Sequence, residues 1–183
     1  MRKLLFAALL SVLAGPAFAD GKPPAIAAIK PPAIAGAIKA EQPYGTGKYR
    51  ILLFTIYDIA LWTDATAWSM QTPFALVLTY HLSFSSSSIV DRSLEEMKHD
   101  NPALSVAALA AYRAQMAGLF PDGKSGDTLT GLYAPDGTAK FFHNGEPTGE
   151  VHDPAFAQAF FGIWLSPQTS DPGLRAQLLH LRP

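Results

Sequence analysis

The last fifty residues constrain the fold most, because strand, turn and helix signals follow one another there without filler. The strand at Thr138–His143 runs into Asn144-Gly145, and an Asn-Gly pair is the strongest short signal for a two-residue hairpin turn. Two helices are expected next, over about 154–165 and 172–180, and each begins with an Asp-Pro pair that supplies the N-cap and a first-turn proline. A sheet therefore precedes a pair of closely spaced helices.

The middle of the chain adds more strands and two further helices. Apolar residues on both parities over Lys48–Trp62 predict one strand with both faces covered, entered through a turn at Gly45-Thr46-Gly47. Further strands are expected over Phe74–Leu82 and Thr128–Tyr133. Between them, helices are expected after the N-caps Ser85 or Ser86 and Ser105. Antiparallel-looking strands with grouped helices predict an α+β fold, with helices packed on one face of the sheet.

The first 19 residues have the form of a secretory signal peptide. Arg2-Lys3 precede the short apolar stretch Leu4–Leu13, and Ala17-Phe18-Ala19 has the small-x-small form that signal peptidase accepts. The apolar stretch is too short to span a bilayer, so no stable membrane span is expected. We predict cleavage before Asp20 and a periplasmic or secreted protein.

Residues 20–43 form a Pro/Ala/Ile-rich segment with an internal repeat. Lys22–Ile29 reads KPPAIAAI, and Lys30–Ile38 reads KPPAIAGAI. The proline pairs exclude a helix across them and favour extended or polyproline backbone. The segment is interpreted as a linker or a loosely docked strand before the domain 44–183, and a peptide that binds a partner is the alternative.

Composition excludes several classes of protein. Hydrophobic residues make up 49% and charged residues 16%, so the chain can build a core and is not a basic nucleic-acid-binding protein. The leader contains Arg2 and Lys3 and no acidic residue, so its removal changes the net charge from −1 to −3. The absence of cysteine excludes disulfides, thiolate nucleophiles and Cys metal sites.

Residues 44–181 resemble the chalcone isomerase-like family, in its bacterial exported branch. The resemblance is carried by an ordered set of motifs rather than by any single one. That set comprises Gly45-Thr46-Gly47, Phe54–Leu61, Tyr80, Leu104-Ser105, Leu119-Phe120, Gly126-Asp127, Asn144-Gly145, Gly149, Phe156, Ile163-Trp164-Leu165 and Leu178-Leu179. The resemblance implies an open antiparallel sheet with helices on one face and an apolar cleft between them. It also implies one of two activities, closure of a flavanone ring or non-catalytic binding of fatty acids.

The catalytic set of the plant isomerases is mostly missing at the matching positions. The strand threonine is kept as Thr55, but the family's arginine falls near Pro43 and its tyrosine near Ser85. The family's asparagine falls near Arg92, and its late threonine near Gly162. Isomerisation needs cationic or hydrogen-bonding groups around the developing charge, so no catalytic residue is assigned here. Non-catalytic binding is expected, with a lyase that has a rebuilt site, or a periplasmic interaction module, as the alternatives.

Four residues are predicted to bind an apolar small molecule such as a fatty acid. Thr55 and Tyr57 share a strand face and would be polar anchors, Arg92 would meet a carboxylate, and Trp164 would pack on the acyl chain. Ordinary core packing is the competing interpretation of the late-helix aromatic residues. No cofactor or metal site is predicted, since the His and Glu residues at 143–152 flank an exposed turn without a metal motif.

Overall fold

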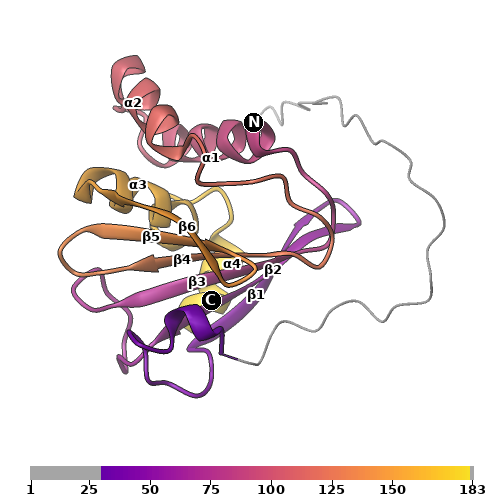
Figure 1. Ribbon diagram of the computed structural model, residues 1–183, viewed down its shortest axis with the longest axis vertical. Helices are drawn as coiled ribbons and strands as arrows, with labels where there is room; N and C mark the ends of the chain where they lie inside the picture. The colour runs from indigo at the N-terminus through magenta and orange to yellow at the C-terminus, as the bar shows by residue number, and fades with distance from the viewer. Residues whose placement is uncertain (1–29, 182–183) are drawn as a thin grey trace.

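The computed structural model describes residues 30–181, and the predicted signal peptide and the first copy of the repeat lie outside this range. Six strands form one sheet in the order β1-β2-β3-β4-β5-β6, and every neighbouring pair is antiparallel. The strands are β1 (Gly45–Ile51), β2 (Phe54–Thr63), β3 (Phe74–Tyr80), β4 (Thr128–Tyr133), β5 (Thr138–His143) and β6 (Glu146–His152). The expected open antiparallel α+β fold is therefore confirmed (Figure 1).

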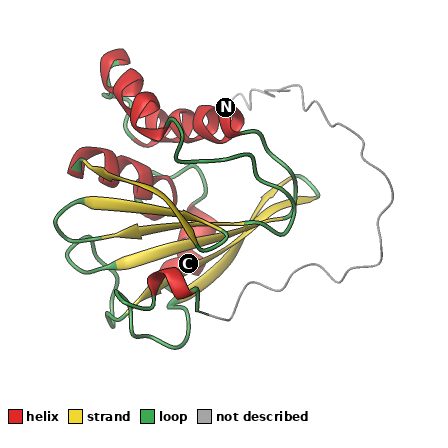
Figure 2. Ribbon diagram, viewed as in Figure 1, coloured by secondary structure: helices red, strands yellow, loops and turns green. Residues whose placement is uncertain are grey.

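The helices form two layers on one side of the sheet. They are α1 (Ser86–Asp100), α2 (Val106–Met116), α3 (Pro154–Leu165) and α4 (Pro172–Leu179). Figure 2 shows α3 next to the strands, with α1 and α2 farther from the sheet. The predicted N-caps Ser85, Ser105, Asp153 and Asp171 each accept a hydrogen bond from the first turn of their helix. None of the helices within residues 30–181 is long and apolar enough to cross a bilayer.

Two predictions about the first strands are wrong. The run Lys48–Trp62 is a hairpin and not one strand, because a turn at Leu52-Leu53 separates β1 from β2. Gly45-Thr46-Gly47 is part of β1 and not a turn. Its glycines are needed because α4 lies directly on this strand: a Cβ at Gly45 would overlap the backbone carbonyl of Leu178. A glycine pair thus marks a close helix–strand approach here.

The other face of the sheet is covered by the second copy of the repeat. A 3-10 turn at Pro32–Ile34 places Ile34 and Ile38, both 0% exposed, in a hydrophobic cluster with residues of β2, β3 and β4. The carboxylate of Asp64 accepts hydrogen bonds from the backbone N–H of Lys39 (2.8 Å) and of Ala40 (2.6 Å). From Lys30 onward the segment is therefore packed into the domain, which differs from the predicted linker, because burial of the two isoleucines offsets the entropy of ordering.

Candidate functional site

The layer between the sheet and α3 is filled by aromatic side chains. Phe156 and Phe161 of α3 are 0% exposed and Phe160 is 3% exposed. Phe160 packs on Phe141 of β5 with ring centroids 5.0 Å apart, and Phe161 packs on Phe74 of β3 at 4.9 Å. Edge-to-face contacts of this kind leave little free volume. The cleft expected between sheet and helices is thus filled beneath α3, where the core interpretation of these aromatic residues holds.

Trp164, at the end of α3, marks the border of this filled layer. Its indole Nε1–H donates a hydrogen bond to the hydroxyl of Tyr57 on β2, with 2.9 Å between the heavy atoms. Burial raises the pKa of the Tyr57 phenol above its usual value, and the hydrogen bond from Trp164 offsets only part of that effect. Tyr57 is therefore a neutral hydrogen-bonding group at physiological pH.

Beyond Trp164 lies a group of tyrosines in which Tyr49 and Tyr57 are only partly covered, while Tyr80 is buried. The rings of Tyr49 and Tyr57 stack with centroids 5.0 Å apart, and Tyr80 meets Tyr57 edge-on at 6.5 Å. Phe84, just before α1, lies 5.5 Å from Tyr80. We call Tyr49, Tyr57, Tyr80, Phe84 and Trp164 the tyrosine cluster. Tyr49, Tyr57 and Phe84 are half-buried, whereas the aromatic residues beneath α3 are buried.

Arg92 of α1 closes one side of the tyrosine cluster. Its Nη2 donates to the hydroxyl of Tyr49 at 3.3 Å and also pairs with Glu96, while Nη1 pairs with Glu95 at 3.3 Å. Glu96 is only 7% exposed. The predicted partner for a ligand carboxylate therefore already has two carboxylate partners within the protein, and these three side chains together carry a net charge of −1.

The structure brings three of the four predicted residues together. Tyr57 and Trp164 are hydrogen-bonded, and Arg92 joins them through Tyr49. Thr55 is half-buried two residues before Tyr57, opposite Arg50 in the β1–β2 ladder. Tyr49 and Glu96 were not predicted, and the missed hairpin turn explains the first omission. Once β1 and β2 are recognised as a hairpin, their register places Tyr49 opposite Tyr57.

A separate ionic group lies at β1 and β2 around a buried carboxylate. Asp58 is 0% exposed, with Lys48 Nζ at 2.7 Å and His81 Nε2 at 3.1 Å from its oxygens. Near the last hairpin, His152 pairs with Glu150 at 2.9 Å, whereas His143 pairs with Asp127 at 3.3 Å. No group of three or more metal-ligating side chains occurs within residues 30–181.

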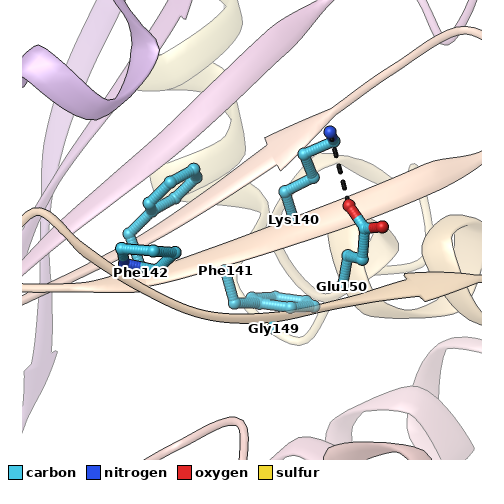
Figure 3. Close-up of a pocket in the computed structure, with 6 residues that line it drawn as sticks. Lys140, Phe141, Phe142, Gly149 and Glu150 are labelled. Carbon is cyan, nitrogen blue, oxygen red and sulfur yellow. Dashed lines mark ion pairs between the residues drawn. The ribbon is translucent and has the colours of Figure 1, made fainter.

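Two surface hollows lie away from the tyrosine cluster. The first, about 350 Å³, is at the β5–β6 bulge, and Figure 3 shows Lys140 and Glu150 at its side, paired at 3.3 Å. The second, about 240 Å³, is lined by Met70, Gln71, Tyr133, Pro135, Pro154 and Gln158. None of the residues that line these two hollows belongs to the tyrosine cluster.

The open antiparallel meander with helices on one face defines an α+β fold, and comparison with known proteins specifies the family. Residues 43–180 match the family model described as chalcone isomerase-like, so the chain belongs to the chalcone isomerase-like family. An uncharacterized protein of Haemophilus influenzae is 27% identical over 139 residues, covering 75% of this chain and 67% of that protein.

A solved structure supports the same fold. The crystal structure of a fatty-acid binding protein from Arabidopsis thaliana superposes with a TM-score of 0.58, covering 75% of this chain and 86% of that one. Its sequence identity to this chain is 10%. At that identity the likeness shows the fold, and function must be argued from the site itself.

Proposed function

We propose that this protein binds an apolar small molecule at the tyrosine cluster, without converting it. The observation that carries the proposal is the state of the Tyr57 hydroxyl. It accepts the hydrogen bond of Trp164, while none of the hydrogen bonds within residues 30–181 provides an acceptor for its own proton. A phenol that retains a free donor beside half-buried aromatic rings is suited to bind the polar end of an apolar molecule.

The ligand class follows from the aromatic walls and from the charges around Arg92. The rings of Tyr49, Tyr57 and Phe84 offer apolar surface for an acyl chain or a flat ring. The fold is shared with the fatty-acid binding protein of Arabidopsis thaliana. Because Glu95 and Glu96 already pair with Arg92, a neutral head group fits this site better than a third carboxylate.

The absence of most of the isomerase catalytic set supports binding without turnover. By its resemblance to the plant enzymes, the chain keeps the strand threonine as Thr55, and the position of their tyrosine falls near Ser85. The Ser85 hydroxyl is used as the N-cap of α1, where it accepts a hydrogen bond from the backbone N–H of Ser88. Because this hydroxyl is already committed to the cap and to the Ser88 hydroxyl, it is a poor replacement for the missing phenol.

Export is part of the same proposal. The residues that support it are Arg2-Lys3, the apolar stretch and Ala17-Phe18-Ala19, all of which precede the described range. The intact mass of the protein recovered from a periplasmic fraction tests it. A chain that begins at Asp20 supports export, and an unprocessed chain retained in the cytoplasm contradicts it.

The binding test uses delipidated protein and a matched pair of ligands. A fluorescent acyl probe is titrated into the protein and then displaced by a long-chain fatty acid or by the alcohol of the same length. We expect uptake, with tighter binding of the alcohol. Tyr57→Phe should weaken binding about fivefold to tenfold through loss of one hydrogen bond.

The control variant is Tyr133→Phe, which removes a hydroxyl from the filled aromatic layer and should bind like the unmodified protein. Absence of probe uptake, with no lipid recovered by solvent extraction of the freshly purified protein, contradicts the proposal. Turnover of a chalcone that is lost in Thr55→Ala or Arg92→Ala would instead establish the rebuilt lyase.

A further inference from the structure

The tip of the β1–β2 hairpin exposes four consecutive large apolar side chains. The exposed fractions are 49% for Ile51, 90% for Leu52, 96% for Leu53 and 65% for Phe54. Outside this tip, Val106 and Leu181 are the large hydrophobic residues of the described range that are exposed. In Figure 1 the hairpin ends at the right-hand edge of the part of the chain that the structure describes, on the side away from α2 and α3. We call residues 51–54 the apolar tip.

The turn has leucine at a position where its backbone conformation normally requires glycine. Ile51 pairs with Phe54, which leaves Leu52 and Leu53 as the two turn residues, and Leu52 has φ of 53°. Type II′ hairpin turns have positive φ at this first position, where glycine is strongly preferred. Leucine adopts that region rarely, because its Cβ crowds the backbone. Hairpin formation alone therefore gives no reason for two leucines at the turn.

The shape of the apolar tip limits what can cover it. A convex tip cannot enclose a small molecule, and four side chains at one turn fall well short of the ~800 Å² per partner that a stable protein interface buries. An apolar tip of this size fits the boundary between lipid head groups and acyl chains, where burial is proportional to the apolar area inserted.

Charge near the apolar tip points to the same occupant. Arg50 precedes Ile51, is exposed, and forms no ion pair within residues 30–181. Lys48 lies two residues before Arg50 on the same strand, farther from the tip. Its side chain is 43% exposed, and its ammonium pairs with Asp58. A free guanidinium beside an apolar loop complements the phosphate of an anionic lipid.

We propose that the apolar tip inserts into the surface of a lipid bilayer, with Arg50 bound to anionic head groups. This inference goes beyond the proposed ligand site and does not require it. The two are adjacent, because Tyr57 is three residues after Phe54 on β2. Insertion of the tip would therefore bring the tyrosine cluster close to the bilayer surface.

The experiment measures flotation of the purified protein with vesicles. One set of vesicles is phosphatidylcholine alone, and the other contains equal parts of phosphatidylcholine and phosphatidylglycerol. We expect binding to the anionic set, reduced more than about tenfold by the double change Leu52→Ser and Leu53→Ser, since two exposed side chains lose their transfer free energy. Arg50→Gln should weaken binding to anionic vesicles severalfold and leave binding to neutral vesicles unchanged.

The matched control is Val106→Ser, which removes an 85% exposed apolar side chain at the start of α2. It should float like the unmodified protein, and circular dichroism checks that all variants are folded. Three results would overturn the inference: no flotation with either vesicle set, flotation of the double variant at the unmodified level, or a tip-dependent dimer in solution that accounts for the exposed leucines. The acyl probe is also titrated into the double variant. If the double variant binds the probe but no longer floats with vesicles, the tip is needed for membrane binding and not for the proposed ligand site.

Discussion

Two aromatic regions lie side by side on the helix-covered face of the sheet, and they differ in how completely they are packed. Beneath α3, Phe156, Phe160 and Phe161 are buried among rings of the central and late strands. Near the first turns of α1, Tyr49 and Tyr57 remain half-buried, with Trp164 at the boundary. The first region consists mainly of phenylalanine rings, with Tyr133 among them, whereas the second consists mainly of tyrosines. We therefore expect stability to depend mainly on the first region, and the proposed ligand to use the polar groups of the second.

The largest expected effect tests the first side of this comparison. Phe161→Ala removes a 0% exposed ring that packs on Phe74 and Tyr133. It should lower the free energy of unfolding by about 3–5 kcal/mol, because the buried cavity cannot fully collapse. Denaturant unfolding followed by circular dichroism measures the change. Phe84→Ala in the tyrosine cluster should cost clearly less, and equal losses would mean that the two regions are packed alike.

A smaller loss of stability is expected at the Tyr57–Trp164 hydrogen bond, which lies between the two aromatic regions. Tyr57→Phe leaves the buried indole N–H of Trp164 without its acceptor, which should cost about 1–3 kcal/mol of unfolding free energy. The double change Tyr57→Phe and Trp164→Phe removes both partners and should cost less than the sum of the two single changes. The same denaturation measurement checks the two single variants and the double variant. If the double change costs the sum of the two single changes, the hydrogen bond does not couple the regions.

The N-caps of α3 and α1, the helices next to the two aromatic regions, predict different effects of acid on stability. α3 is capped by Asp153, whose pKa is held below its usual 3.8 mainly by the hydrogen bond from Gln115, with smaller contributions from the backbone N–H groups of Phe156 and Ala155. Because the folded-state pKa is lowered, this stabilisation is present above about pH 4 and is lost as the pH falls through the folded-state value. α1 is capped by Ser85, which does not titrate in this range.

The test compares Asp153→Asn with Ser85→Ala between pH 7 and pH 3. Asp153→Asn keeps a capping oxygen, so its deficit in stability relative to the unmodified protein should shrink as the pH falls. Ser85→Ala should cost about 1 kcal/mol at every pH. If the stability deficit of Asp153→Asn does not depend on pH, the negative charge of Asp153 does not contribute to the stability of α3.

The smallest expected effect concerns ligand selectivity in the tyrosine cluster. Glu96→Gln removes one negative partner of Arg92 and keeps the shape of the side chain. We expect the affinity for a fatty acid, relative to the alcohol of the same length, to rise up to about fivefold, the range of a single ion pair. Competition against the acyl probe measures this ratio. An unchanged ratio would indicate that Arg92 does not face the head group.

Prediction from sequence succeeded where local chemistry decides the structure. The four helix starts were predicted at Ser85 or Ser86, Ser105, Asp153 and Asp171, because capping depends on residues within one turn. The strands at 128–133 and 138–143 were likewise recognised from their turn residues. The β1–β2 hairpin was missed, because Leu52-Leu53 has none of the glycine or asparagine that normally marks such a turn.

The site was predictable as a set of residues but not as a geometry. Tyr57, Trp164 and Arg92 were selected from the sequence, and the side chains that join them, Tyr49 and Glu96, were not. Trp164 is 107 residues from Tyr57 along the chain, so their hydrogen bond depends on how α3 docks on the sheet. No local pattern encodes a contact of that separation.

By itself the sequence determined the α+β class, the helix starts, the last hairpin and the family resemblance, since each depends on residues that are close in the chain. Tertiary structure alone decided that the aromatic residues of α3 fill the expected cleft, that Arg92 is already paired with two glutamates, and that the second Pro-Pro-Ala-Ile repeat covers the far face of the sheet. The physical reason is that packing and ion pairing depend on which surfaces meet, and long-range burial selects those surfaces after the local elements have formed.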